Sequence, residues 1–189
     1  MGFFGRKAKK QDVVVSQPAE DATPRPRTIT VRLLGTEGAG QSTLLQVLAK
    51  HVARQGASHS LEDGYVLDWK GVEITIRETH FFQLGEEPVP QADQWYLVVG
   101  LDEGPVDLDQ LLPGAADLPL RGVFMSKSDF VDDDALVDLC KIETCSTLDQ
   151  SGISSDTLTF IVGSAYDAAE GYVPNGISAL EDLLEDIIR

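Results

Sequence analysis

The amino-acid sequence predicts an α/β protein in which a mostly parallel sheet lies between helices as a three-layer sandwich. Three observations predict it. Short, nearly continuous apolar runs occur at residues 95–100, 122–126 and 158–163, helical patterns lie between and after them, and a glycine-rich turn joins an early strand to a helix. Continuous apolar runs are typical of strands buried on both faces, and strands that alternate with helices favour parallel pairing. Ligands of such folds bind at the carboxyl ends of the strands.

The first expected elements are a strand, a glycine-rich turn and a helix. Residues 28–34 are rich in β-branched and apolar side chains, as in a strand, and the turn follows at residues 35–40. From residue 42 apolar residues recur at helical spacing, and Gly56 is a stop signal for this helix.

The next expected element is a hairpin. Residues 64–69 and 71–76 alternate between apolar and polar side chains, with Lys70 and Gly71 at the junction, which predicts two antiparallel strands joined by a tight turn.

The rest of the chain is expected to alternate strands and helices. The three apolar runs are predicted to be central parallel strands, with Phe124, Met125 and Phe160 in the core. Cap-type residues predict helices from Asp132 and from Asn175. The last helix carries one apolar stripe. Its members are Ile177, Leu180, Leu183, Leu184, Ile187 and Ile188.

Length and composition fit one domain with a tail. The chain has 189 residues, of which 42% are hydrophobic and 24% charged, as in a soluble protein with a sizeable core. Residues 1–27 mix proline with polar and charged residues and show no periodicity, so we expect a disordered tail there and one folded domain at residues 28–189. No apolar run approaches the roughly 20 residues of a membrane-spanning helix. We expect a cytoplasmic protein in which Cys140 and Cys145 are reduced.

Charge is distributed unevenly between the tail and the domain. The chain carries a net charge of −16; residues 1–27 have six basic and three acidic side chains, a net of +3, which leaves −19 for the rest. An acidic domain repels phosphate backbones, so no direct nucleic-acid binding is expected. Residues 1–10 place Phe3 and Phe4 beside four basic side chains, which suits peripheral contact with an anionic membrane or a partner's groove. A tail that only keeps the protein soluble fits the same pattern.

The glycine-rich turn is the strongest candidate site. Its sequence, GTEGAGQST, has the frame G-x-x-x-x-G-K-[ST] of the phosphate-binding loop in P-loop NTPases, and it lies between a strand and a helix as that loop does. In such a loop, backbone N–H groups surround phosphate oxygens and the helix N-terminus adds partial positive charge. The Ser42 hydroxyl would hold Mg²⁺. A simple strand-to-helix turn is the alternative. The candidate ligand-binding residues are Gly35, Glu37, Gly38, Ala39, Gly40, Gln41, Ser42 and Thr43.

Two residues of this turn oppose phosphate binding. Gln41 stands where the motif has lysine, and an amide donates only uncharged hydrogen bonds. Because a charge-assisted hydrogen bond contributes roughly 1.5–3 kcal/mol, the affinity for phosphate is expected to fall by about ten- to hundredfold or more. The Glu37 carboxylate adds like-charge repulsion wherever it points toward phosphate.

Together with the glycine turn, three later segments resemble the guanine-nucleotide domain of translational GTPases, most closely that of elongation factor Tu. DQWYLVVGLDEGP at 93–105 resembles the family's apolar strand and its acidic-glycine-proline turn. VFMSKSDFVDDDALVDL at 123–139 resembles the strand with the guanine-reading N-K-x-D motif, and FIVGSAYDAAEG at 160–171 resembles the strand and S-A-[LK] loop of the base pocket. The resemblance covers residues 28–189. It implies the small G-domain form of the P-loop NTPase fold, with GTP or GDP as ligand and without the β-barrel domains of elongation factors.

The resemblance also assigns a base pocket. Asp129 would accept hydrogen bonds from guanine N1 and N2, Lys127 would pack along the base, and Ser164 and Ala165 would contact guanine O6. Ser126 replaces the asparagine of the motif, and we expect its shorter side chain not to bridge to the glycine turn. Guanine reading is then weakened but retained. The alternative is that Lys127 and Asp129 are simply the polar end of a strand and bind no base.

The family's switch elements are not recognisable. In the family's D-x-x-G motif the aspartate reaches Mg²⁺ through water and the glycine binds the γ-phosphate. Here Glu78 is the nearest acid and Phe81 or Phe82 stands in place of the glycine. His80 lies before the family's catalytic histidine, so no catalytic role is assigned to it. No threonine in residues 57–64 matches the metal-binding one.

The sequence therefore predicts a pseudo-GTPase with weak or lost GTP or GDP binding, uncertain Mg²⁺ binding and no assigned catalytic residue, which acts by binding an unidentified protein. One alternative is a slow GTPase switch whose missing charge a partner supplies. Another is an adaptor held at a membrane by residues 1–10.

Overall fold

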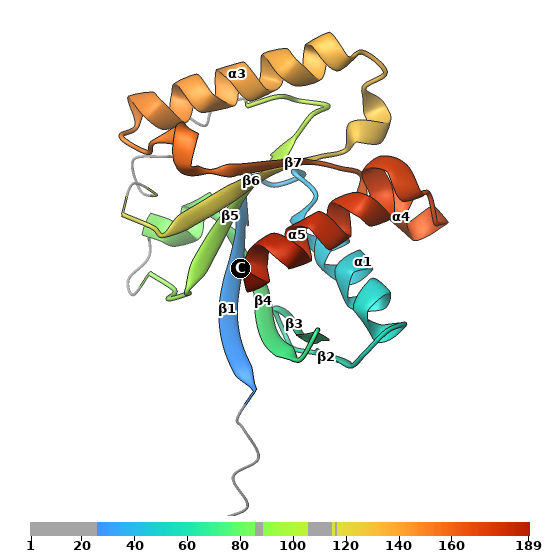
Figure 1. Cartoon of the computed structure of the whole chain (residues 1–189). Helices are drawn as coiled ribbons and strands as arrows, with labels where there is room; N and C mark the ends of the chain where they lie inside the picture. Colours follow the sequence, from blue (N-terminus) through green and yellow to red (C-terminus); the bar gives the residue numbers. More distant parts are fainter. Residues whose placement is uncertain (1–25, 86–88, 106–114, 116) are drawn as a thin grey trace, which may run out of the picture.

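The computed structural model describes residues 26–85, 89–105, 115 and 117–189 and has a seven-stranded sheet at its centre (Figure 1). The strand order is β2-β3-β4-β1-β5-β6-β7. The four contacts from β4 through β1, β5 and β6 to β7 are parallel, and the two contacts on the β2 side are antiparallel. The strands are β1 (Arg27–Gly35), β2 (Ser58–Ser60), β3 (Gly64–Trp69), β4 (Val72–His80), β5 (Gln94–Gly100), β6 (Leu120–Ser126) and β7 (Thr159–Val162).

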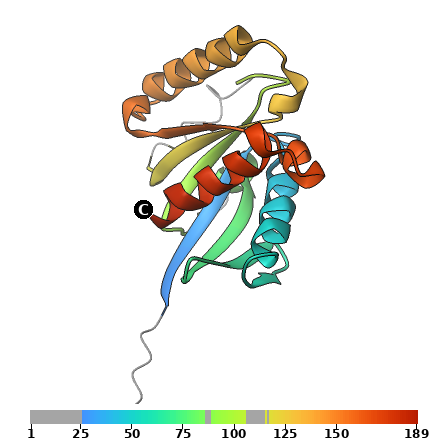
Figure 2. The ribbon, with the colours of Figure 1, turned by 45° about the vertical axis from the view of Figure 1, so that its right-hand side comes forward.

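Helices lie on both faces of this sheet, which confirms the predicted α/β class and is compatible with a three-layer sandwich. In Figures 1 and 2, α3 covers one face, and α1, α4 and α5 lie on the other. The helices are α1 (Gln41–Ala53), α3 (Asp134–Gln150), α4 (Ala165–Glu170) and α5 (Ser178–Ile188). No helix within the described ranges has a stretch that is both long and apolar enough to cross a bilayer.

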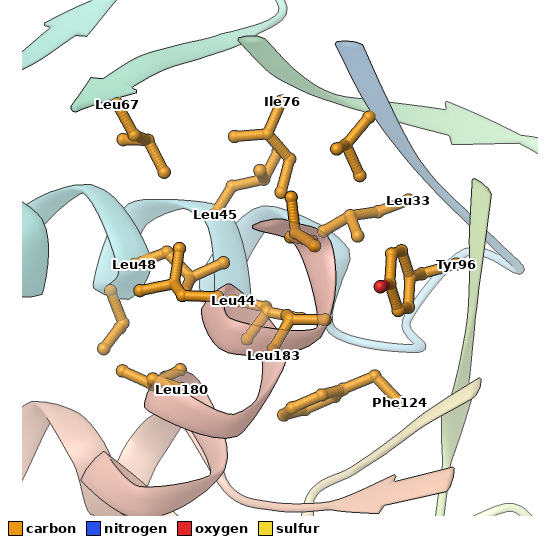
Figure 3. Close-up of a cluster of buried hydrophobic side chains, with 14 of the residues drawn as sticks. Leu33, Leu44, Leu45, Leu48, Leu67, Ile76, Tyr96, Phe124, Leu180 and Leu183 are labelled. Atoms are coloured by element: carbon orange, nitrogen blue, oxygen red, sulfur yellow. The ribbon is translucent and has the colours of Figure 1, made fainter. Parts of the chain in front are cut away.

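Each face of the sheet has its own hydrophobic core. Alternate residues of a strand point to opposite faces, so β5 sends Tyr96 and Val98 toward α1 and α5, and Leu97 and Val99 toward α3. Both faces are apolar because both are covered, which explains the continuous apolar runs in the sequence. Figure 3 shows the larger core, in which leucines of α1 and α5 meet side chains of the sheet. The labelled residues are Leu33, Leu44, Leu45, Leu48, Leu67, Ile76, Tyr96, Phe124, Leu180 and Leu183.

The hairpin prediction is confirmed. β3 and β4 pair in antiparallel register from Trp69 opposite Val72, with only Lys70 and Gly71 between the strands. Both turn residues have positive φ angles, 51° and 78°. Two-residue hairpins require this backbone because it matches the right-handed twist of the strands, and glycine adopts it without strain.

Helix α5 is held to the sheet by a polar network as well as by its apolar stripe. The buried Asp186 carboxylate accepts a hydrogen bond from Tyr96 Oη at 2.6 Å and another from Thr159 Oγ1 at 3.1 Å. Arg121 Nη2 lies 3.3 Å from the same carboxylate. Because buried carboxylates are stable only when paired and hydrogen-bonded, these contacts fix α5 across β5, β6 and β7.

Three sequence expectations need correction. β7 is an edge strand and not a central one, and its Phe160 is only half-buried. The last α-helix begins at Ser178, because Asn175 has a left-handed backbone (φ 57°) that interrupts the helical turn before it. The short strand β2 was not expected, since its sequence, SHS, carries no apolar alternation.

Other predictions about the secondary structure and the core are confirmed. The first strand and helix are confirmed, and so are core positions for Phe124 and Met125. The predicted helix from Asp132 is α3, which begins two residues later with Asp133 as its cap: the Asp133 side chain accepts a hydrogen bond from the backbone N–H of Ala135. Residues 1–25 of the predicted tail lie outside the described residues.

Candidate functional site

The glycine turn lies where the strand order reverses. Strand β1 has β4 as its neighbour on one side and β5, which comes later in the chain, on the other. A crevice forms at the carboxyl ends of strands at such a point, and open α/β sheets bind ligands there. Residues 35–40, here called the glycine loop, lead from β1 into this crevice and then into α1.

The backbone of the glycine loop requires glycine at two positions. Gly38 and Gly40 have φ angles of 85° and 100°, in the left-handed region that other residues enter only with strain. The backbone N–H of Ala39 donates to Thr36 O at 3.2 Å, which closes the turn. Gly40 then caps α1, since the N–H of Leu44 donates to its carbonyl at 2.9 Å.

A cavity of about 550 Å³ lies over the glycine loop and the start of α1. Its volume is within the range of small-molecule sites, which is about 300–1,000 Å³. Six of the eight candidate residues at positions 35–43 line it, and so does Lys127, which follows β6. The lining residues are Glu37, Gly38, Gly40, Gln41, Ser42, Thr43, His80, Phe82 and Lys127.

Gln41 is buried at the wall of this cavity. Its side chain lies against Gly35, where a Cβ atom would come within 2.6 Å of Nε2. Only 3% of Gln41 is exposed, and its Nε2 has no hydrogen-bond partner. A buried amide donor without a partner is costly, so this group is available to a ligand that carries an acceptor. Gly35 therefore has a steric role: its lack of a side chain leaves room for the side chain of Gln41.

Ser42 is joined to the end of β4. Its Oγ donates to Glu78 Oε2 at 2.5 Å. The parallel register of β1 with β4 places Leu33 beside Glu78 and Gly35 beside His80, so the ends of the two strands are level. The predicted metal-binding hydroxyl is therefore hydrogen-bonded to a carboxylate. These two groups could hold Mg²⁺ only with oxygens from a ligand, since Mg²⁺ in proteins usually keeps one or two carboxylates together with phosphates.

His80 and Phe82 were not assigned to the site from sequence. Their rings stack with centroids 5.6 Å apart and planes tilted by 5°, and both line the larger cavity. Phe82 is 70% exposed. The available signal was their position: His80 ends β4 and Phe82 follows it, and the neighbouring parallel strand β1 leads into the glycine loop at the same edge of the sheet.

A second cavity of about 180 Å³ adjoins the first, and Gly40, Thr43 and Lys127 line both. Asp129 and Ala165 also line it, so the structure brings together segments from β6, β7 and the glycine loop, as expected. Phe130 and Tyr166 complete its wall and were not predicted. The lining residues are Gly40, Thr43, Ser126, Lys127, Asp129, Phe130, Ala165 and Tyr166.

Ser164 lies beside this cavity but does not line it. Its Oγ accepts a hydrogen bond from the N–H of Asp167 at 3.0 Å, and the residue is buried as the cap of α4. Ala39 is also buried behind the cleft, where its carbonyl faces Ser126.

The expectation that Ser126 is too short to reach the glycine loop is wrong. Ser126 Oγ donates to Ala39 O at 2.5 Å and lies 3.2 Å from Val99 O. A Cβ at Gly40 would make only ordinary contact with Ser126 Oγ, at 3.5 Å, so glycine is needed there for its φ angle of 100° and not for space. A hydroxyl therefore makes the bridge from β6 to the loop.

Lys127 links the two cavities, but its charge is already paired. Its Nζ lies 2.6 Å from Asp102 Oδ2, in the turn after β5, and both side chains are 26% exposed. Lys127 has a left-handed backbone, with φ 61° and ψ 37°. This conformation costs a non-glycine residue roughly 1–2 kcal/mol, so the surrounding contacts must hold it. The ion pair with Asp102 is one of them.

Among the described residues, the larger cavity thus combines the acidic Glu37 with the paired Lys127 and the stacked rings of His80 and Phe82, and the smaller cavity combines Asp129 with Phe130 and Tyr166. No model of a known protein family matches the chain. What the fold and the cleft define is the class: an α/β protein with a ligand-sized crevice at the carboxyl edge of a mostly parallel sheet.

Proposed function

We propose that the chain is a degenerate G domain, similar to that of elongation factor Tu, which acts as a binding protein and not as a GTPase. The observation that carries this proposal is the composition of one cleft. The four segments that resemble the family's motifs lie far apart in sequence, yet the glycine loop, Lys127, Asp129 and Ala165 line the two adjoining cavities, and Asp102 pairs with Lys127.

The charges of the cleft support loss of phosphoryl transfer. That reaction depends on positioned positive charge and metal ions to stabilise the transferred phosphoryl group. Among the described residues that line the larger cavity, Lys127 is the only lysine or arginine, and Asp102 already neutralises it. Glu37 lines the same cavity, and Glu78 is bonded to Ser42. The phosphate end is therefore acidic, where a working GTPase needs cations.

The switch position also supports a binding protein. After Glu78 the chain continues into Phe81, which is buried, and Phe82, which is exposed. A glycine that could turn its N–H toward a γ-phosphate is replaced by these aromatic residues. Without that contact the segment gains no free energy from GTP that it does not gain from GDP, so the two nucleotides would not switch its conformation.

An exposed apolar row on α3 supports the protein-binding part of the proposal. Leu136, Leu139 and Ile142 follow one another at intervals of three and are exposed. Exposed apolar patches are typical of protein interaction sites. The partner we propose is a protein that also binds elongation factor Tu, because this chain would present a similar domain to it.

The enzymatic part is tested by restoring the missing charge. The wild-type chain and the Gln41→Lys variant are assayed for binding of fluorescent GDP and GTP and for GTP hydrolysis. We expect no hydrolysis above background in either. We also expect Gln41→Lys to bind GTP about tenfold more tightly than wild type, because lysine adds one charge-assisted hydrogen bond. Gln150→Lys, at the end of α3, adds the same charge outside the cleft and should change nothing.

Turnover by the wild-type chain would refute the proposal in favour of a slow GTPase switch. The protein-binding part is tested by co-purification with translation-factor partners from native extract. Leu139→Lys should abolish that association, and absence of any such partner with the wild-type chain would count against it.

A further inference from the structure

We propose that the cleft selects a guanine nucleoside with one phosphate or none over GTP, the reverse of the preference of a working G domain. This inference rests on the proposed function, since it takes the smaller cavity as the base site. The proposal follows from the different lining of the two cavities: carboxylates at the glycine loop repel negative charge, while the smaller cavity pairs two aromatic rings with one hydrogen-bond acceptor, Asp129.

Two carboxylates and the pairing of Lys127 disfavour a chain of phosphates at the larger cavity. Gln41 Nε2, buried and without a partner, offers only uncharged donors there. Glu37 lines the cavity and Glu78 lies within hydrogen-bonding distance of Ser42. The Lys127 ammonium is held by Asp102 at 2.6 Å. Each phosphate added to a ligand therefore adds repulsion from carboxylates, and the described residues that line this cavity include no free lysine or arginine to offset it. The amide nitrogen of Gln41 carries two N–H donors, which a hydroxyl or the oxygens of a single phosphate could accept.

The smaller cavity favours a flat, uncharged group. Two large rings border it, Phe130 and Tyr166, and they are 71% and 62% exposed. They lie in the segments that follow different strands, Phe130 after β6 and Tyr166 in α4 after β7. A volume of about 180 Å³ suits one ring system and is too small for a whole drug-sized ligand. Stacking of a nucleobase on an aromatic side chain contributes roughly 1–3 kcal/mol.

Asp129 gives this cavity a preference among bases. An ionised carboxylate only accepts hydrogen bonds. The guanine edge presents two adjacent N–H donors, whereas adenine presents an acceptor nitrogen at the same place, which a carboxylate repels. The ribose would then lie near Gly40, Thr43 and Lys127, where the two cavities meet.

The test is calorimetric titration of the full chain with guanosine, GMP, GDP, GTP and adenosine, each with and without Mg²⁺. We expect guanosine and GMP to bind at least about tenfold more tightly than GTP, which corresponds to about 1.4 kcal/mol. Mg²⁺ should have no effect, and adenosine should not bind. Binding of GTP more tightly than guanosine, or no binding of guanosine at all, would overturn the inference.

Variants of Tyr166 test the aromatic contact itself. Tyr166→Ala should weaken guanosine binding by about tenfold, while Tyr166→Phe, which keeps the ring, should bind as wild type. Tyr172→Ala removes an equally exposed tyrosine outside both cavities and serves as a control. Unchanged binding in Tyr166→Ala would refute the stacking role. The proposed function fails on a different result, GTP hydrolysis by the wild-type chain, so the two failures can be told apart.

Discussion

Ser42 and Glu78 lie 36 residues apart in the chain and share a hydrogen bond of 2.5 Å beside the larger cavity, which Ser42 lines. The bond brings the first turn of α1 to the end of β4. It also places a negative charge beside the position that the terminal phosphates of a nucleotide would take. Its consequences for ligand binding can be measured directly.

Removing this charge should improve phosphate binding. In a Gln41→Lys background, Glu78→Gln is expected to increase the affinity for GTP several-fold, because a neighbouring like charge costs about 1 kcal/mol at short range in water. The measurement is fluorescent GTP titration in EDTA, so that Mg²⁺ does not contribute. Glu73→Gln changes an exposed acid near the other end of β4 and should leave the affinity unchanged. Equal or weaker binding in Glu78→Gln would contradict the repulsion argument.

The bridge from β6 to the glycine loop should contribute to stability. Ser126→Ala removes the hydroxyl that contacts Ala39 O and Val99 O, and we expect a loss of about 1 kcal/mol or more in the free energy of unfolding. Ser128→Ala is the matched control, because the Ser128 hydroxyl is buried without a partner, and its removal should cost nothing. Urea unfolding midpoints compare the two. A smaller loss in Ser126→Ala than in Ser128→Ala would refute the bridge.

The network around Asp186 should also be measurable by unfolding. Tyr96→Phe keeps the ring but removes the hydroxyl that donates to the carboxylate at 2.6 Å. Hydrogen bonds to charged groups contribute roughly 1.5–3 kcal/mol, so we expect a loss of that order. Tyr166→Phe makes the same chemical change at an exposed ring and should have no effect. If both variants unfold at the wild-type midpoint, the network does not stabilise α5.

The same tyrosine predicts a loss of stability in alkali. Burial, together with the hydrogen bond to Asp186 and the charge of Asp186, raises the pKa of Tyr96 above its usual value of about 10. The folded state therefore holds this proton more tightly than the unfolded state does. Its contribution is complete below about pH 10 and declines as the pH rises above that value. Between pH 9 and pH 11 the wild-type chain should lose more stability than Tyr96→Phe. Parallel curves for the two proteins would contradict this.

The two cysteines should react at different rates with a thiol reagent. Burial raises the pKa of Cys140, which reduces the thiolate that reacts, whereas Cys145 is only half-buried. Cys140→Ser should leave one fast thiol and Cys145→Ser one slow thiol in native protein. In denaturant both variants should react alike. A faster reaction of Cys145→Ser in the native state would be the contrary result.

Local sequence predicted the elements that depend on local chemistry. The β-branched run before the glycine loop, the helical apolar spacing after it and the lysine-glycine turn of the hairpin each depend on a few adjacent residues. β2 escaped prediction because three polar residues carry no pattern, and its pairing with β3 supplies the strand. The edge position of β7 also escaped, since an apolar run does not reveal how many neighbours a strand has.

The sequence allowed the segments that form the candidate site to be predicted, but not the hydrogen bonds between their side chains. The loop and the residues after β6 and β7 could be placed because parallel strands end at one edge. The contacts of Ser42 with Glu78 and of Ser126 with Ala39 depend on strand register and on close approach of the backbone, which no spacing encodes. Phe130 and Tyr166 line the smaller cavity because each follows a strand by a few residues, yet as single aromatics they were indistinguishable from surface residues.

The contact of Arg27 Nη1 with Ile188 O, at 2.8 Å, has a use in engineering. The Arg27 side chain thereby links the start of β1 to the end of α5. A linker of a few residues could therefore join α5 to β1 in a circularly permuted chain, with new ends opened at the exposed turn around Gly152. Such rearrangements are tolerated where termini are close and the opened loop is at the surface. In that permuted chain the glycine loop would lie in the interior of the sequence, and ligand binding could be followed with reporter proteins fused at Gly152, remote from β1.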